Sequence, residues 1–396
     1  MAVTFDPTDP GFLDDPYPTY ARLRREAPIH RHPTGFVVVS RYADVTRVLK
    51  TPEVFSSEAM GGSQPRTGSD GEIAPTSGSL IGQDPPVHTR QRSIVNRGFT
   101  PGRIAGYEPR IRQVVEDLFE RFESTGQVEL IGQLAAPLPV TMIAELLGLD
   151  PKRRDDFKRW SNSLIVASTS PGESRSDPKH RQNFAEFRQY IREVIEERRA
   201  APRDDLVSVL VNAEERDGVL TPDQVFAFAS LLLAAGSETT MNLIGNAVLA
   251  LLAHPDALER VCADLSLVPR LIEETVRWDP PVQMVMRLTT RETELGGEAL
   301  PARAMVIVLL AAANRDPDTF PDPDRFDLDR NTQGHLGFGF GNHFCLGASL
   351  ARLEARVALE SVLGRLAKLR PGDSRVERHG SFLVRGASAL PLAFDA

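Results

Sequence analysis

The segment from Leu231 to Ala253 is the most apolar stretch of the chain and limits most strongly what the chain can fold into. It is long enough to span a lipid bilayer, but Glu238, Asn242 and Asn246 would place polar groups inside the hydrocarbon, where they are costly. A helix that is apolar on nearly all sides also occurs at the centre of large water-soluble proteins. The sequence therefore predicts a buried central helix and no membrane span.

Flanking residues indicate where this helix begins and ends. Thr221 to Gln224, TPDQ, combines a capping-box pair with a proline at the first helical position, and His254-Pro255 supplies a stop. From Pro86 to about Ala263, apolar residues recur at three- and four-residue spacing, as in IRQVVEDLFERF. We therefore expect a helical body of about residues 86–290.

Short apolar runs predict β-structure at both ends of the chain. GFVVVS lies in a region of about residues 1–80 that is rich in proline and glycine. MVIVLLAAA, after Leu300, favours a buried strand, with a helix as the alternative, and SFLVRG and ALPLAF are expected to form a closing hairpin. Ser56 to Ser79 predicts a long mobile loop. No stretch resembles an interdomain linker, so residues 1–396 are expected to form one domain.

Charge and cysteine count exclude several classes of protein. The net charge of −8 opposes general nucleic-acid binding, because phosphates would be repelled. The two cysteines, Cys262 and Cys345, are too few for a disulfide framework or a cysteine zinc site. Cys262 is expected to be a small buried apolar side chain. With no signal-like N-terminus, we expect the protein to lie in the cytoplasm. We also expect a monomer.

Cys345 lies in FGFGNHFCLG, Phe338 to Gly347, directly before a helical pattern. At a helix N-terminus, unpaired N–H groups and the helix dipole favour a thiolate over a thiol. The glycines allow tight turns and close approach to a flat partner, and the phenylalanines exclude water. A dinucleotide loop is excluded, because Phe344 stands where the third glycine of G-x-G-x-x-G is needed. The loop therefore predicts a soft metal ligand.

FGFGNHFCLG resembles the haem-binding signature of the cytochrome P-450 family, F-G-x-G-x-H-x-C-x-G, at every fixed position. The resemblance implies that Cys345 is the axial thiolate of a haem b iron, with Phe338 and Gly339 against the haem. It also implies the family's fold, mainly α with a smaller β region. In that fold the haem lies between the long central helix and the helix after the cysteine loop.

The segment AGSETT, Ala235 to Thr240, places an acid and two threonines inside the apolar helix. Such groups cost stability unless they are hydrogen-bonded, and a helix bend made by threonine bonds to local carbonyls is one explanation. The segment also resembles the family's distal motif, A/G-G-x-D/E-T-T. By that resemblance Ala235 borders the haem, Thr239 forms a hydrogen bond to bound oxygen, and Glu238 relays protons through water.

Glu274 and Arg277 stand three residues apart in EETVR, on one face of a predicted helix. The spacing alone is common and proves nothing. It resembles the family's E-x-x-R motif, which pairs with an arginine of a later segment, and PDRF offers Arg325. By this resemblance the three residues are structural and hold the cysteine loop in place.

DPPVHTRQR places His88 and Arg92 on one face at the start of a helix, where both can donate hydrogen bonds to carboxylates. For each residue, a solvated side chain is the alternative. The resemblance assigns His88, Arg92, Arg287 and His343 to the two propionates of the haem.

The resemblance implies a monooxygenase that places one atom of O2 in an apolar small molecule, by hydroxylation or epoxidation. Because the chain has no flavin or iron–sulfur motif, electrons from NAD(P)H would arrive through a ferredoxin reductase and a ferredoxin. Arg352 and Arg356 are expected to attract an acidic ferredoxin. A haem carrier or sensor, and a peroxide-driven or isomerising haem enzyme, are alternatives; the presence of both Glu238 and Thr239 weighs against them.

The segments that face the substrate in this family are mostly apolar or small in this chain. They predict a bulky apolar substrate, such as a terpenoid, steroid, macrolide or fatty acid, with Gln283 as a polar contact. The loop from Met60 to Leu80 and the connection from Leu164 to Pro178 are expected to contribute. The other expected pocket residues are Ala234, Val282, Gln283, Val285, Phe382 and Leu383.

Overall fold

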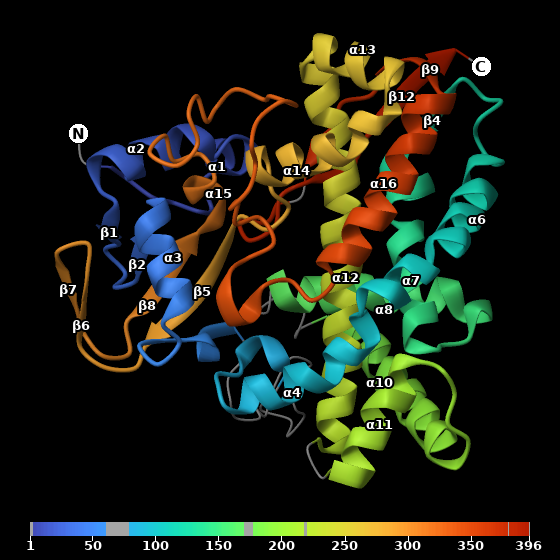
Figure 1. Cartoon of the computed structure of the whole chain (residues 1–396), viewed down its shortest axis with the longest axis horizontal. Coiled ribbons are helices and arrows are strands. Elements are labelled where there is room, and N and C mark those ends of the chain that lie inside the picture. The colour runs from blue at the N-terminus through green and yellow to red at the C-terminus, as the bar shows by residue number, and fades with distance from the viewer. Residues whose placement is uncertain (1–2, 61–78, 170–176, 218–219, 379, 396) are drawn as a thin grey trace.

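The computed structural model describes residues 3–60, 79–169, 177–217, 220–378 and 380–395. Most of the predicted loop from Ser56 to Ser79, and part of the connection from Leu164 to Pro178, lie outside the described residues. The described part is mainly helical with a smaller β region, as the sequence predicts. In Figure 1 the largest sheet lies on the left, beside the N-terminal helices, and the helical body lies on the right.

The described residues form α-helices along the whole length of the chain. They are α1 (Pro10–Asp14), α2 (Tyr17–Glu26), α3 (Tyr42–Lys50), α4 (Val87–Val95), α5 (Pro101–Gly106), α6 (Glu108–Phe119), α7 (Pro137–Leu147), α8 (Arg154–Thr169), α10 (Pro178–Ala200), α11 (Leu206–Asp217), α12 (Pro222–Ala253), α13 (Pro255–Ala263), α14 (Val268–Trp278), α15 (Leu310–Ala313) and α16 (Ala348–Arg365).

The strands are short and come from both ends of the chain. They are β1 (Ile29–Arg31), β2 (Val37–Val39), β3 (Phe55–Ser56), β4 (Gln127–Glu129), β5 (Met284–Thr289), β6 (Thr293–Leu295), β7 (Glu298–Leu300), β8 (Met305–Leu309), β9 (Ala367–Pro371), β10 (Glu377–Arg378), β11 (Ala387–Ala389) and β12 (Pro391–Asp395).

The largest sheet has the strand order β1-β2-β8-β5-β3 and is covered on both faces. Strand β2 pairs in parallel with β8, with Val37 opposite Val306. Val38 packs into the apolar cluster that contains Tyr20 of α2, whereas Val37 and Val39 pack into the cluster that contains Val45 of α3. Alternate side chains of a strand point to opposite faces, so a strand covered on both faces is apolar throughout.

The structure decides one alternative that the sequence left open, and it contradicts one prediction about the C-terminal strands. MVIVLLAAA is a strand over its first five residues, β8, and a single helical turn over the last four, α15. The expected closing hairpin is wrong: β12 pairs with β4 and β9, β11 pairs with β10, and Val384 bridges to Val282. An alternating pattern identifies a strand but does not identify its partner.

The prediction that Cys262 is a buried apolar side chain is wrong, because Cys262 is exposed.

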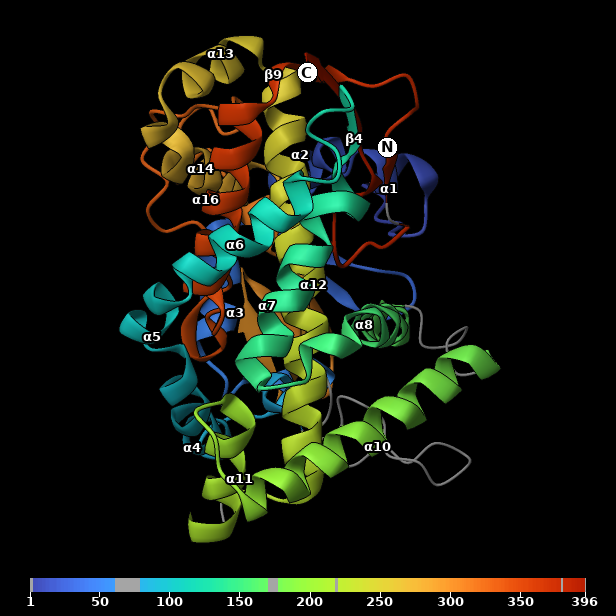
Figure 2. The same cartoon turned by 90° about the vertical axis from the view of Figure 1, so that its right-hand side faces the viewer.

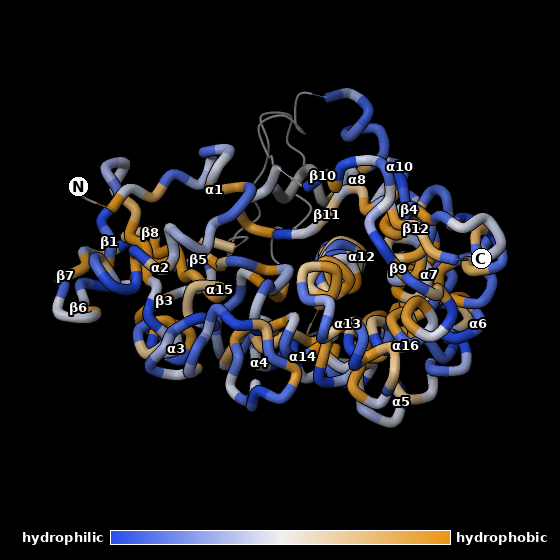
Figure 3. The backbone as a smooth tube through the Cα atoms, turned by 90° about the horizontal axis from the view of Figure 1, so that it is seen from above, coloured by the Kyte–Doolittle hydropathy of each residue, from blue (hydrophilic) through white to orange (hydrophobic). Residues whose placement is uncertain are grey.

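Helix α12 has the predicted ends. Thr221 and Gln224 form both bonds of the capping box, with the Thr221 N–H donating to Gln224 Oε1 at 2.8 Å. The helix runs 32 residues to Ala253 and packs against α7, α8, α14 and α16. Figure 2 shows it crossing the whole molecule, and Figure 3 shows it nearly end-on, with other elements around it. Among the described residues, no helix is both long and apolar enough to cross a membrane.

Glu354 of α16 is a buried carboxyl whose effect on the free energy of unfolding can be measured. Its side chain is 2% exposed, and burial raises its pKa from 4.5 to about 8. Because the folded pKa is the higher one, this carboxyl progressively destabilises the fold as pH rises from about 4.5 to about 8. We expect Glu354→Gln to gain roughly 1 kcal/mol or more relative to wild type across that range. Urea unfolding at several pH values measures this gain, and a pH-independent difference would contradict it.

Candidate active site

The cysteine loop is closed by its own backbone. The N–H of Cys345 donates to the carbonyl of Phe338 at 2.8 Å, and the N–H of Gly339 donates to Leu336 O at 2.8 Å. Gly339 and Gly341 have φ angles of 74° and 68°, in the left-handed region that favours glycine. The glycines of the motif are therefore required by the turn that presents the sulfur, which lies three residues before α16 begins at Ala348.

The protein around Cys345 does not by itself favour a thiolate. Burial raises the pKa of Cys345 above its usual value, although the Gly347 N–H, Arg92 and Arg352 each act to lower that pKa. The N–H at the helix start acts in the expected direction, but burial of the sulfur outweighs it. A metal cation bound to the sulfur would supply that stabilisation, since coordination deprotonates a thiol.

One face of α12 carries exposed residues although most of the helix is buried. Ala235 is exposed and Thr239, one turn later, is half-buried. The Thr239 hydroxyl donates to Ala235 O at 2.7 Å. Glu238 is 8% exposed, and burial raises its pKa from 4.5 to about 7. This face thus combines a hydroxyl oxygen with a carboxyl that can bind and release a proton near neutral pH.

Four cationic or potentially cationic side chains from three distant segments come together near the cysteine loop. The rings of His88 and His343 lie with centroids 4.3 Å apart, and Arg92 Nη2 donates to Phe344 O at 2.7 Å. Burial and the charges of Arg287, His88 and Arg92 lower the pKa of His343 to about 3. The structure therefore assembles all four residues that the sequence analysis assigned to a pair of carboxylates.

Comparison with known proteins supports one family. The sequence model described as Cytochrome P450 matches residues 157–381. The chain is 40% identical to the vitamin D(3) 25-hydroxylase of Pseudonocardia autotrophica, over 96% of this chain and 94% of that protein. It is 39% identical to the cytochrome P450 monooxygenase PikC of Streptomyces venezuelae, over 96% and 91%. The structure of cytochrome P450 CYP109Q5 from Chondromyces apiculatus matches with a TM-score of 0.90 and 43% identity, over 100% and 99% of the two chains. The chain belongs to the cytochrome P450 family.

This P450 is accordingly a monooxygenase, an oxidoreductase, and its family implies haem and O2. The described residues fit a haem. Both ring nitrogens of His88 are buried without a hydrogen-bond partner, and Arg287 is only 4% exposed. Asp84 is the carboxylate that acts on these two side chains. A buried donor set with so little negative charge is suited to carboxylates such as propionates, and the Cys345 sulfur is a suitable iron ligand.

The framework behind the cysteine loop of this P450 corrects one prediction. Glu274 and Arg277 are 1% and 0% exposed, and Arg277 donates to both carboxylate oxygens of Glu274 at 2.7 Å. The second arginine is Arg330, whose Nε lies 3.3 Å from Glu274 Oε1. Arg325 is not the partner: its side chain is 71% exposed, and only its carbonyl joins the network. The chain turns irregularly after PDRF, so spacing could not show which arginine returns to α14.

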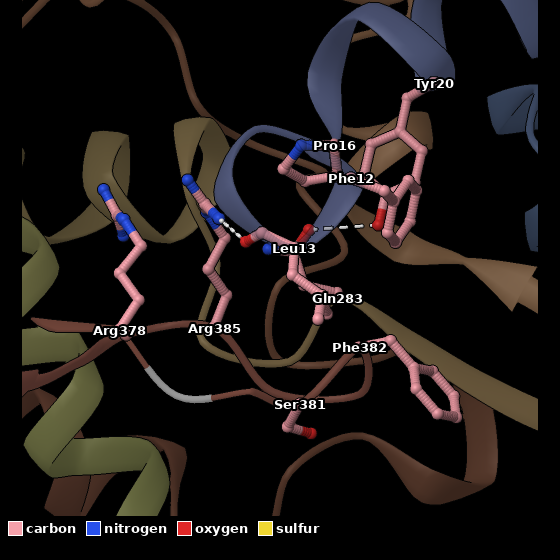
Figure 4. Close-up of a pocket in the computed structure, with 10 residues that line it drawn as sticks. Phe12, Leu13, Pro16, Tyr20, Gln283, Arg378, Ser381, Phe382 and Arg385 are labelled. Atoms are coloured by element: carbon pink, nitrogen blue, oxygen red, sulfur yellow. Dashed lines mark hydrogen bonds between the residues drawn. The ribbon is translucent and has the colours of Figure 1, made fainter. Parts of the chain in front are cut away.

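The predicted substrate contacts of this P450 are only partly consistent with the structure. Gln283 is contradicted: its Nε2 donates to Pro280 O at 2.8 Å, and its Oε1 accepts from Tyr20 Oη at 3.2 Å. Figure 4 shows this amide beside the N-terminal helices. Ala234, Val282, Val285, Phe382 and Leu383 are half-buried, and their role as substrate contacts stays a prediction.

Several residues of the site were not found from sequence. Ser57 Oγ lies 2.9 Å from His343 Nε2, and Asp84 accepts from Ser56 Oγ at 2.6 Å. Asn314 Oδ1 accepts from Leu336 N at 2.6 Å, and Asn314 O accepts from Arg277, so Asn314 joins the loop to α14. Asp84 lies within the quoted motif DPPVHTRQR, but only the fold shows its partners, and the same holds for Asn314 in the segment ANRDP. Ser57 carries no recognisable signal.

The arginine correction gives a direct test. Arg330→Ala removes a charged, 8% exposed partner of Glu274, so we expect a loss of about 1–3 kcal/mol in the free energy of unfolding. Arg325→Ala is the matched control, and we expect a change within about 0.5 kcal/mol because its side chain faces solvent. Urea unfolding measures both. Equal losses, or a larger loss for Arg325→Ala, would restore the original assignment.

Proposed function

We propose that this P450 inserts one oxygen atom of O2 into a bulky apolar molecule, by hydroxylation or epoxidation, in the cytoplasm. Electrons come from NAD(P)H through a ferredoxin reductase and a ferredoxin. The observation that carries this proposal is the acid–alcohol pair, Glu238 and Thr239, on the face of α12 that also exposes Ala235. The pair matters because O2-dependent oxygen insertion consumes protons, whereas an electron carrier has no need of them.

The residues of the site have separate tasks. Haem held by Cys345 would supply the activation of O2, and His88, Arg92, Arg287 and His343 would bind its carboxylates. The hydrogen of the Thr239 hydroxyl is directed to Ala235 O, so the hydroxyl oxygen is free to accept a hydrogen bond from a proton-bearing group. Because the Glu238 pKa lies near 7, this carboxyl can give up a proton at neutral pH and take another.

An apolar substrate is supported by the side chains near this face. Ala234, Val282 and Val285 are half-buried and carry no polar group, and with Gln283 bonded elsewhere no substrate contact among them supplies a hydrogen bond. Such a lining binds mainly by burying apolar surface. A relative that is 40% identical is a vitamin D(3) 25-hydroxylase, which acts on a large apolar molecule. A steroid, terpenoid, macrolide or fatty acid fits the same requirement.

The acid–alcohol role is tested by one substitution and a control on the same helix. With ferredoxin, reductase, NAD(P)H and a substrate, Thr239→Ala should divert electrons from product to peroxide and lower the product formed per NAD(P)H several-fold. Ser237→Ala is the control: its hydroxyl also donates to the helix, to Leu233 O at 2.7 Å, but it is only 4% exposed. We expect normal coupling there. Unchanged coupling in Thr239→Ala would favour peroxide-driven or isomerising chemistry.

The ferredoxin surface needs different residues from those first expected. Arg352 is paired with Glu273 at 2.6 Å, and Arg356 is paired with Glu108 at 2.7 Å, so each is largely neutralised. Phe344, beside Cys345, is 42% exposed, and Lys50 Nζ lies 4.9 Å from the ring of Phe340 in the same loop.

Lys50, Arg90 and Arg97 are exposed and form no ion pair within the described residues. Arg90 lies on α4, and Arg97 follows that helix directly. These unpaired charges near an exposed apolar residue form a surface suited to an acidic ferredoxin.

Charge reversal tests this surface. Lys50→Glu combined with Arg97→Glu should slow reduction by ferredoxin roughly tenfold at low salt, and the difference should disappear as salt screens the charges. Arg375→Glu is the control, because Arg375 is exposed and lies beyond the far end of α16, whose 18 residues span roughly 27 Å. Stopped-flow reduction measures all three rates. An unaffected double variant, or an equal loss in the control, would place the partner elsewhere.

A further inference from the structure

A stripe of polar side chains runs along α12 away from the acid–alcohol pair. Glu238, Asn242 and Asn246 are four residues apart, so each lies about one turn beyond the last on the same face of the helix. They are 8%, 0% and 1% exposed. Buried polar groups at successive turns of an apolar helix are costly, and the acid–alcohol chemistry accounts only for Glu238.

Asn242 has no partner in the described protein. Its Oδ1 and Nδ2 atoms are both buried and neither forms a hydrogen bond. The amide lies directly against the backbone of Gly386, because a Cβ placed on that glycine would be 2.1 Å from Asn242 Oδ1. Most buried polar groups in proteins form hydrogen bonds, either to protein or to ordered water. An amide whose oxygen and nitrogen both lack a protein partner is therefore suited to binding ordered water.

A small pocket with both polar and apolar lining residues lies at Gly386. Gly386 lines it together with Arg378, Arg385, Ser381 and Tyr20, and its volume of about 10 Å³ is close to that needed for one water molecule. Arg378 Nη1 is buried without a hydrogen-bond partner. Figure 4 shows Arg378 and Arg385 extending in the same direction at this pocket. Asn242 therefore lies between Gly386, which lines this pocket, and Glu238, which lies one turn earlier on α12.

Asn246, the last residue of the stripe, is hydrogen-bonded to two backbone carbonyls. Its Nδ2 donates to Asp279 O at 3.0 Å and to Arg385 O at 3.2 Å. Arg385 Nε in turn donates to Asp279 Oδ1 at 3.0 Å, and Tyr17 Oη donates to the same oxygen at 2.5 Å. This network fixes the segment that includes Gly386 against α12. The position of Asn242 relative to the pocket is thus set by bonded neighbours.

We propose that Asn242 is a positioning residue for proton supply, holding water that connects the pocket at Arg378, Arg385 and Gly386 with Glu238. The proposal rests on the proposed role of Glu238. Each proton that Glu238 gives up is replaced by one from the adjacent water, and the outermost water takes a proton from solvent. Only O–H bonds form and break. The Asn242 amide keeps its own protons and orients water through Nδ2–H and Oδ1.

The experiment follows exchange of the Glu238 proton, without turnover. The haem-loaded protein carries Glu354→Gln, which removes the other buried carboxyl with a strongly raised pKa among the described residues. At about pH 6, mixing with D2O shifts the infrared band of the protonated Glu238 carboxyl, which Glu238→Gln identifies by its loss. We expect Asn242→Leu to slow this shift by roughly tenfold or more. Its free energy of unfolding should not fall, because the amide has no protein partner to lose.

A second pair of variants distinguishes loss of the hydrogen-bonding group from an effect of misfolding. Asn242→Val and Asn242→Thr have nearly the same shape and differ by one hydroxyl, so only the threonine should exchange at a rate near that of wild type. Equal rates for valine and threonine, or a wild-type rate for a folded Asn242→Leu, would overturn the proposal. In turnover, Asn242→Leu should release more peroxide. If no electron source yields product from any variant, the proposed function fails while the exchange rates still decide the role of Asn242.

Discussion

The structure depends on keeping one apolar helix of 32 residues away from water. A helix that is apolar on nearly every side must be covered along its whole length, which requires a large body built around it. Helices α7, α8, α14 and α16 supply that cover. The same requirement makes the exceptions informative. Where α12 exposes Ala235 in its middle, or buries Glu238, the sequence departs from what packing alone would select.

Helix α12 was predictable in detail because its signals are local. The capping box at Thr221, the following proline and the stop at His254 act within one turn of the residues they concern. The cysteine loop was equally accessible, since the left-handed angles of Gly339 and Gly341 are required by a turn within ten residues. In both cases the structure is decided by neighbours in sequence, which a pattern can report.

Long-range partners were not predictable in the same way. The C-terminal strands have the expected apolar alternation, yet β12 pairs with β4, more than two hundred residues earlier. Arg325 lies in the expected motif, but Arg330 reaches Glu274 because the irregular chain between them determines which side chain turns inward. The prediction that Gln283 contacts the substrate was wrong because Tyr20, from the other end of the chain, donates a hydrogen bond to its amide oxygen. Each error concerns a contact whose geometry is fixed by the whole fold.

The family resemblance grouped the four propionate-site residues before their geometry was known, and the structure shows the electrostatic cost of bringing them together. His88 and Arg92 lie on α4, Arg287 lies on β5 and His343 lies in the cysteine loop. Burial, together with the charges of the other three residues, lowers the pKa of His343 to about 3. Burying cationic groups together costs free energy, and a bound anion would offset part of that cost. The polar stripe on α12 follows the same logic with neutral groups. Asn242 is buried without a partner, at a cost that water joined to Glu238 would offset.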